Sequence, residues 1–120
     1  MFRLSIPVIH VASITVAEAF YCEKLGFRKE FKNQAQPEQS DPCYMGLVRD
    51  AAYLHVSSFS GDSVAGAAIN LIVDDVDRLH RELQQQGVEI AMEPTDQTWG
   101  NREMYVRDPD GNCLRFLQVS

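Results

Sequence analysis

Residues 98–116 read TWGNREMYVRDPDGNCLRF, and the tetrapeptide DPDG at 108–111 divides this stretch into two halves. Proline presets φ at the first corner of a turn, aspartate suits the second, and glycine accepts the positive φ of a bulged hairpin. The residues on both sides alternate between apolar and polar types, as residues of half-buried strands do. We therefore predict strands over 102–107 and 112–119, joined by this turn.

The alternation also assigns the two faces of the hairpin. One parity is wholly apolar, and we expect it to pack on helices. Its members are Met104, Val106, Leu114 and Phe116. The other parity is mixed, and its large amphipathic side chains suit a ligand cavity. Its members are Glu103, Tyr105, Cys113, Arg115 and Leu117.

The first half of the chain predicts a strand, a helix and three further strands. Residues 4–12 form an apolar run rich in Ile and Val. Ser13 is a candidate N-cap for a helix over 13–25, and Gly26 suits its C-terminal end. The strands expected after it cover 27–31, 42–48 and 52–57, with a polar loop over 33–40. Within 52–57, Leu54 and Val56 face one side and Tyr53, His55 and Ser57 the other.

The same order recurs after about half the chain. Residues 67–73 are apolar, Asp75 is a candidate N-cap, and an apolar helical stripe follows until Gly87. A strand is expected over 88–91, before the hairpin already described. Each half is too small to be stable alone, so the two are expected to share a buried surface.

These elements predict an α+β fold of two tandem βαβββ modules. We expect one curved mixed sheet with a concave cavity and with helices on its outer face. The whole of 1–120 would form a single domain, with module 1 over about 1–58, a linker over about 59–66 and module 2 over about 67–120. The linker is rich in Gly, Ser and Ala.

Composition limits the classes of partner. Eleven basic and 17 acidic residues give a net charge of −6, which argues against nucleic acid and anionic membrane and leaves room for a neutral or cationic small ligand. No apolar run approaches membrane-spanning length, and the first residues do not read as a signal peptide, so we expect a cytoplasmic protein. The three cysteines form no CxxC pair and are expected to be reduced structural thiols.

Four segments of the sequence resemble the vicinal oxygen chelate superfamily, which comprises glyoxalases, extradiol dioxygenases and bleomycin-resistance proteins. They are IPVIHV at 6–11, AFYCEKLGF at 19–27, LIVDDVDRLHRELQQQGVEI at 71–90 and the stretch at 98–116. The last segment is similar to the sequences of the bleomycin-resistance subgroup. The resemblance covers nearly the whole chain and implies the paired-module fold.

The superfamily's enzymes hold a metal ion with His and carboxylate side chains at four positions. Carried over one at a time, these positions are occupied here by Ile6, His55, Ala68 and Arg115. Of these four residues, only His55 has a side chain that can ligate a divalent metal ion, and the positive charge of Arg115 would repel one. Including the nearby His10 gives two ligands, which is still short of three. We therefore expect no metal and no other cofactor.

The bleomycin-resistance subgroup also lacks these ligands, and it sequesters a large cationic glycopeptide at the interface of a homodimer. The resemblance thus implies a metal-free homodimer that binds a drug or another organic ligand. The alternative is a glyoxalase-superfamily enzyme, of the lyase or dioxygenase type, that uses His55 as an acid or base on a small carbonyl or aromatic substrate.

The candidate ligand-binding residues each have two interpretations. Trp99 either stacks on a ligand at the cavity rim, or packs against a partner subunit or caps the core. His55 is a hydrogen-bonding residue of the cavity rather than a metal ligand. Arg115 contacts an anionic ligand group or pairs with Glu103. Either ligand contact or filling of a polar cavity is open for Glu103 and Tyr105. Tyr44 and Phe59 would lie near the open end, as ligand contacts or as packing and interface residues.

Overall fold

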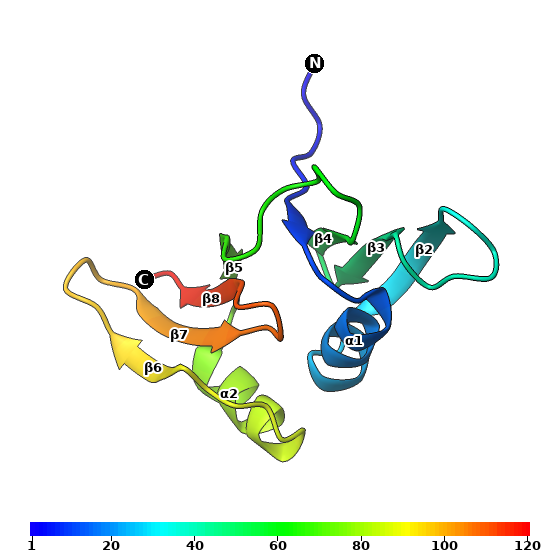
Figure 1. Ribbon diagram of the computed structural model, residues 1–120. Helices are drawn as coiled ribbons and strands as arrows, with labels where there is room; N and C mark the ends of the chain where they lie inside the picture. Colours follow the sequence, from blue (N-terminus) through cyan, green and yellow to red (C-terminus); the bar gives the residue numbers. More distant parts are fainter. The chain divides into compact units, whose positions relative to one another are not determined.

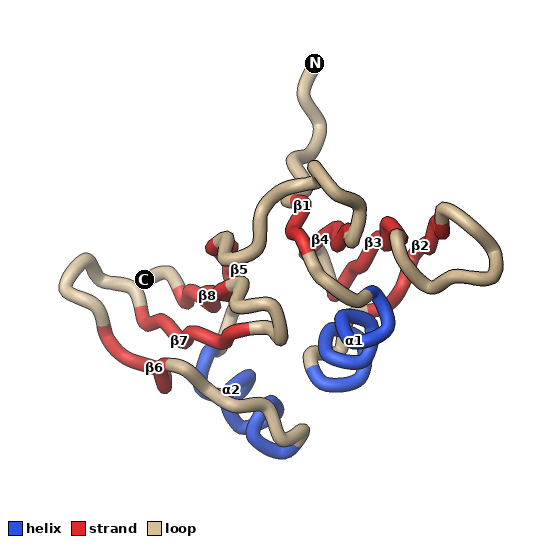
Figure 2. Tube along the Cα trace, in the orientation of Figure 1, coloured by secondary structure: helices blue, strands red, loops and turns tan.

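Each half of the chain folds into a four-stranded mixed sheet with a helical segment on one of its faces (Figures 1 and 2). The protein is described here from a computed structural model that covers residues 1–120 and divides into two units, 1–65 and 66–120. In both units an outer strand pairs in parallel with the last strand, and the other pairings are antiparallel. The predicted α+β class with tandem βαβββ modules is confirmed, and the strands form two sheets.

The first unit has the strand order β1-β4-β3-β2. Its elements are β1 (Val8–His10), α1 (Ile14–Glu18), the π-helix η1 (Ala19–Lys24), β2 (Arg28–Gln34), β3 (Cys43–Arg49) and β4 (Ala52–Ser57). Strands β1, β3 and β4 present a buried apolar face to the helical segment, whereas the residues of β2 are exposed. The buried face carries Ile9, Met45, Leu47, Leu54 and Val56, each at most 1% exposed. The alternation predicted for Leu54 and Val56 is therefore confirmed.

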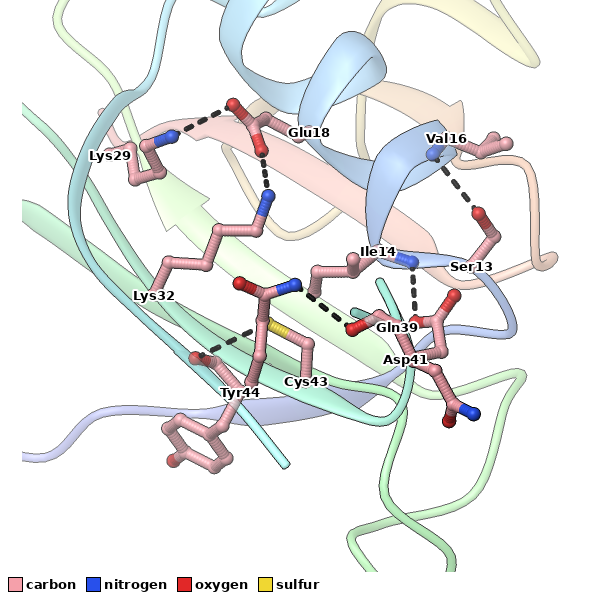
Figure 3. A network of polar contacts seen from close by, with 11 residues as sticks. Ser13, Ile14, Val16, Glu18, Lys29, Lys32, Gln39, Asp41, Cys43 and Tyr44 are labelled. Atoms are coloured by element: carbon pink, nitrogen blue, oxygen red, sulfur yellow. Dashed lines mark hydrogen bonds and ion pairs between the residues drawn. The ribbon is translucent and has the colours of Figure 1, made fainter. Parts of the chain in front are cut away.

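Local polar contacts determine where this helical segment begins. Ser13 is extended, and its Oγ accepts the backbone N–H of Val16 at 3.3 Å, as the sequence predicts for an N-cap. The Asp41 carboxylate accepts the N–H of Ile14 at 2.9 Å, which satisfies another free donor of the first turn. Figure 3 shows both contacts and the ion pairs of Glu18 with Lys29 and Lys32, each at 3.1 Å.

The predicted helix over 13–25 is present, but its second half is a π-helix. The N–H of Leu25 bonds to the carbonyl of Phe20, one residue further back than in an α-helix. This wider turn places Tyr21 in the core, fully buried and edge-on to the rings of Phe20 and Phe27. Gly26 follows with φ of 74°, as expected for the residue that ends the segment.

The second unit has the strand order β5-β8-β7-β6. Its elements are β5 (Ala68–Ile72), α2 (Val76–Gln85), β6 (Met92–Asp96), β7 (Arg102–Arg107) and β8 (Cys113–Gln118). Asp75 is the N-cap of α2, because its carboxylate accepts the N–H of Arg78 at 3.0 Å. The apolar parity of the last hairpin is buried as predicted. Met104, Val106 and Leu114 are 0% exposed, and Phe116 is 6% exposed.

The turn at 108–111 is stabilised by a buried carboxylate. Asp108 is 5% exposed and accepts the N–H groups of Asp110 and Asn112 at 2.9 and 2.8 Å. It also accepts the side-chain amide of Asn112 at 2.9 Å. The side-chain oxygen Oδ1 of Asn112 in turn accepts the N–H groups of Gly66 and Ala67. The turn predicted from DPDG is confirmed, and the same residues also hold the chain that leads into β5.

Three predicted strand boundaries are wrong. The run over 4–12 is a strand only from Val8 to His10, and it begins directly after Pro7, which has no N–H to donate. The polar loop over 33–40 begins later, since β2 continues through Gln34. The strand expected over 88–91 is absent there, because the N–H of Val88 donates to the Leu83 carbonyl at the end of α2, and β6 begins at Met92.

Neither helical segment combines the length and the apolar character that a membrane-spanning helix needs.

Candidate functional site

The sheet face of the first unit that turns away from its helical segment carries a cluster of three aromatic rings. The strand register places Phe31, Gly46 and His55 side by side on β2, β3 and β4. Gly46 lacks a side chain, and a Cβ built there would overlap the ring of Phe31. The Phe31 ring therefore lies directly over the backbone of β3 and reaches the side chains on both sides.

Phe31, Tyr44 and His55 form what we call the aromatic cluster. The rings of Phe31 and Tyr44 are stacked, with centroids 6.2 Å apart and planes 9° apart, and Phe31 meets His55 edge-on at 5.2 Å. Tyr44 Oη and His55 Nδ1 share a hydrogen bond of 2.8 Å. Burial, with the charge of Asp62, raises the pKa of Tyr44, so its hydroxyl stays protonated at neutral pH. Phe31 keeps 37% of its surface exposed.

Phe59 lies just beyond the end of β4, in a turn held by buried polar groups. Its backbone N–H donates to the Ser57 hydroxyl at 3.1 Å, and this hydroxyl donates to the Asp62 carboxylate at 2.8 Å. Ser57 is 0% exposed and pairs with Tyr44 across the strands. The half-buried Phe59 is therefore held two residues after the end of β4, the strand that carries His55 of the aromatic cluster.

The second unit carries a different group of side chains on the sheet face that turns away from α2, centred on the carboxylate of Glu103. Glu103 is 4% exposed. Its Oε2 accepts the indole N–H of Trp99 at 2.9 Å and the amide of Asn101 at 3.3 Å. Its Oε1 accepts the hydroxyl of Tyr105 at 2.8 Å. We call Trp99, Asn101, Glu103, Tyr105 and Arg115 the Glu103 cluster.

The carboxylate in this cluster is ionised. Burial raises the pKa of Glu103, but hydrogen bonds from Trp99, Tyr105 and Asn101, with the charge of Arg115, outweigh burial and hold the pKa below its ordinary value. The same hydrogen bond to Glu103, together with burial, raises the pKa of Tyr105. A negative charge is therefore held inside the sheet face with three donors directed at it.

The structure does not pair Arg115 with Glu103, although both lie on the predicted parity. In the β7–β8 register Arg115 lies opposite Tyr105, while Glu103 lies opposite Leu117. The guanidinium of Arg115 is accordingly placed over the Tyr105 ring, with Cζ 5.8 Å from the centroid. This is a cation–π contact between Arg115 and Tyr105. Arg115 acts on Glu103 only through its positive charge. The predicted ion pair is wrong because parity identifies the face but leaves the register open.

Trp99 lies in the loop between β6 and β7 with 64% of its surface exposed. Its one hydrogen-bond donor is bound to the buried Glu103, so the ring is attached to the sheet at its polar edge. An exposed indole that is held in this way presents a flat apolar surface to solvent. This geometry suits the predicted stacking role within the second unit.

The four positions at which the superfamily's enzymes bind a metal ion do not fit one here. Ile6 and Ala68 have no donor atoms in their side chains, and Arg115 is a cation. His55 uses Nδ1 in the hydrogen bond with Tyr44. The structure contains no group of three or more His, Cys, Asp or Glu side chains that could hold a metal ion.

The predicted ligand-binding residues thus fall into two groups. Tyr44 and His55 are in contact in the first unit, with Phe59 in the turn that follows. Trp99, Glu103, Tyr105 and Arg115 form one connected group in the second unit. Sequence reasoning missed Phe31 and Asn101. A glycine inside a predicted strand was the available signal for Phe31, because it marks close approach of another group.

The chain thus consists of two βαβββ modules, each with aromatic and polar side chains on the sheet face that turns away from its own helical segment. A family model described as Glyoxalase/Bleomycin resistance protein/Dioxygenase superfamily matches residues 3–116, and the chain belongs to this superfamily.

Within the superfamily, the chain is similar to bleomycin-resistance proteins. A bleomycin resistance protein from Geobacillus stearothermophilus is 28% identical over 131 aligned positions that cover 95% of each sequence. The bleomycin resistance determinant encoded on transposon Tn5 has a TM-score of 0.80 and 25% identity, with 99% of each chain covered. A bleomycin-binding protein solved in complex with bleomycin shares the fold, with a TM-score of 0.79, 24% identity, and coverage of 99% of this chain and 100% of that one.

Proposed function

We propose that this protein binds a small organic molecule of the bleomycin type and withholds it from its target, without using a metal ion. The observation that carries the proposal is the exposed Trp99 ring, held at its polar edge by the buried Glu103 carboxylate. Flat ligand groups and cations both stack favourably on an indole face. The similarity in sequence and fold to bleomycin-resistance proteins supports this type of ligand.

The aromatic cluster would supply a second stacking surface. Phe31 keeps an exposed ring face, and Tyr44 and His55 offer polar edges beside it. We further propose a homodimer in the cytoplasm with the ligand in a cavity at the interface between subunits, as the resemblance to the subgroup implies. A net charge of −6 favours a cationic ligand. The proposed ligand-site residues are Trp99, His55, Tyr44, Phe59, Glu103, Tyr105 and Arg115.

Trp99 is the only tryptophan, so its fluorescence provides a direct binding assay. Addition of bleomycin is expected to change the emission saturably, with about one drug bound per subunit. Calorimetric titration measures the same affinity without relying on fluorescence. In this assay Trp99→Ala is expected to weaken binding by roughly tenfold or more, as removal of a buried aromatic contact typically does. Sedimentation of the free and loaded protein tests the dimer.

The matched control is Trp99→Phe, which keeps an aromatic face but loses the indole N–H, and it is expected to bind more tightly than Trp99→Ala. A lack of calorimetric response with the drug at high micromolar concentration would refute bleomycin as the ligand. Equal affinities of wild type and Trp99→Ala would refute the role of Trp99.

One observation favours an enzyme as the second candidate. The hydrogen bond between Tyr44 and His55 orients an imidazole that can transfer protons on an uncovered sheet face. We propose that, in this case, His55 acts as acid or base on a small carbonyl or aromatic substrate. Turnover that is lost in His55→Ala and reduced in Tyr44→Phe would support this activity. Turnover that is unchanged in His55→Ala would refute it.

A further inference from the structure

The side chain of Trp99 is exposed and has one polar contact that can orient it. The residue lies in a loop, and 64% of its surface faces solvent. The loop itself is closed by backbone hydrogen bonds between Gln97 and Asn101 and between Gly100 and Gln97. The ring itself makes one hydrogen bond, from its Nε1 to Glu103, 2.9 Å long. A side chain this exposed otherwise samples several rotamers freely.

The acceptor of this bond is, by contrast, firmly placed. Glu103 is 4% exposed on β7, and its second oxygen accepts the Tyr105 hydroxyl at 2.8 Å. The Tyr105 ring lies under the guanidinium of Arg115. Both carboxylate oxygens are already engaged with donors of the chain itself, and Asn101 adds a third donor. The charge is therefore directed at internal groups.

We propose that Glu103 is a positioning residue, which fixes the Trp99 ring in the orientation that stacks on the ligand. This inference rests on the proposed function, because it assigns Trp99 as the stacking surface. It differs from a direct ligand contact, because Glu103 acts through Trp99. A carboxylate suits the task because it only accepts hydrogen bonds and a charged acceptor binds an N–H more strongly than a neutral one.

The experiment measures the solvent exchange of the one indole N–H by nuclear magnetic resonance, without any ligand. In wild type the indole proton is expected to exchange slowly. Glu103→Ala is expected to accelerate the exchange by roughly tenfold or more, the effect of losing a hydrogen bond to a charged group. Glu103→Gln keeps an acceptor oxygen at the same distance along the side chain and is expected to restore most of the protection.

Two further variants keep the test decisive. Glu103→Asp retains the charge but withdraws the carboxylate by one methylene, so it is expected to lose protection even if Glu103→Ala does not fold. The matched control is Glu18→Ala, which removes a hydrogen-bonded carboxylate from the first unit and is expected to leave the indole unchanged. Slow indole exchange in a natively folded Glu103→Asp or Glu103→Ala protein would overturn the proposal.

A second measurement separates this inference from the proposed function. Bleomycin affinity by calorimetry is expected to fall in Glu103→Asp and to be largely kept in Glu103→Gln. If wild type does not bind bleomycin while indole exchange follows the expected order, the proposed ligand is wrong and the positioning role stands. If wild type binds but Glu103→Asp binds equally well, Glu103 does not position Trp99 for the ligand.

Discussion

Gly46 is expected to be required because the Phe31 ring occupies the place of its side chain. A Cβ at Gly46 would overlap three atoms of that ring, whereas the backbone of Gly46 has no positive φ that would itself exclude alanine. Gly46→Ala must therefore displace Phe31, which is 37% exposed and can move into solvent. The displacement removes the contacts of Phe31 with Tyr44 and His55.

The magnitude follows from those two ring contacts. An aromatic pair contributes about 0.5–1.5 kcal/mol beyond its buried area, so Gly46→Ala is expected to lower the free energy of unfolding by about 1–3 kcal/mol. The same substitution made in a Phe31→Ala protein has no ring to displace. There it is expected to be neutral or to stabilise by up to about 1 kcal/mol, because alanine restricts the unfolded chain more than glycine does.

Urea unfolding of the four proteins in this double-mutant cycle measures the effect. The expected coupling energy between positions 31 and 46, which is the difference between the cost of Gly46→Ala in the two backgrounds, is about 1–4 kcal/mol. A Gly46→Ala cost that persists unchanged in the Phe31→Ala background would show that the backbone of β3, and not the ring, excludes the side chain. A Gly46→Ala protein as stable as wild type would refute the placement of Phe31.

Two further predictions concern buried carboxylates. Asp108→Ala removes an acceptor for three hydrogen bonds at the β7–β8 turn and is expected to lower the free energy of unfolding in urea by about 2–4 kcal/mol. The control Asp74→Ala changes an exposed residue and is expected to alter the free energy of unfolding by no more than about 0.5 kcal/mol. Similar costs for the two substitutions would contradict the role of Asp108 in the turn. The lowered pKa of Glu103 means that its carboxylate stabilises the folded protein above the pKa of the unfolded chain and that this contribution is lost as pH falls through the folded pKa. The stability difference between wild type and Glu103→Gln is therefore expected to shrink as pH falls below the ordinary glutamate pKa of about 4.3. A difference that stays constant as pH falls would show that the carboxylate is not stabilised by its donors.

Parity on the hairpin strands was correctly predicted because it depends only on the two-residue period of a strand. The register between these two strands was not predicted, and it decided that Arg115 contacts Tyr105. A ladder shifted by two residues keeps every side chain on its face but changes each cross-strand neighbour. Glu103 was thus assigned to the correct face with the wrong partner, and its contacts with Trp99 and Tyr105 came from the folded strand and loop.

Local chemistry in the sequence determined the helix starts at Ser13 and Asp75, the glycine ends at Gly26 and Gly87, and the turn at 108–111. These features involve residues within a few positions of each other, so their physics is already present in a short segment. Tertiary structure alone decided that Phe31 lies over Gly46, since a bulge between Lys29 and Phe31 shifts the alternation of β2. Tertiary structure also decided that Glu103 is buried, because β7 must first lie within its sheet, whereas the hydrogen bond of Glu103 with Trp99 joins residues only four positions apart.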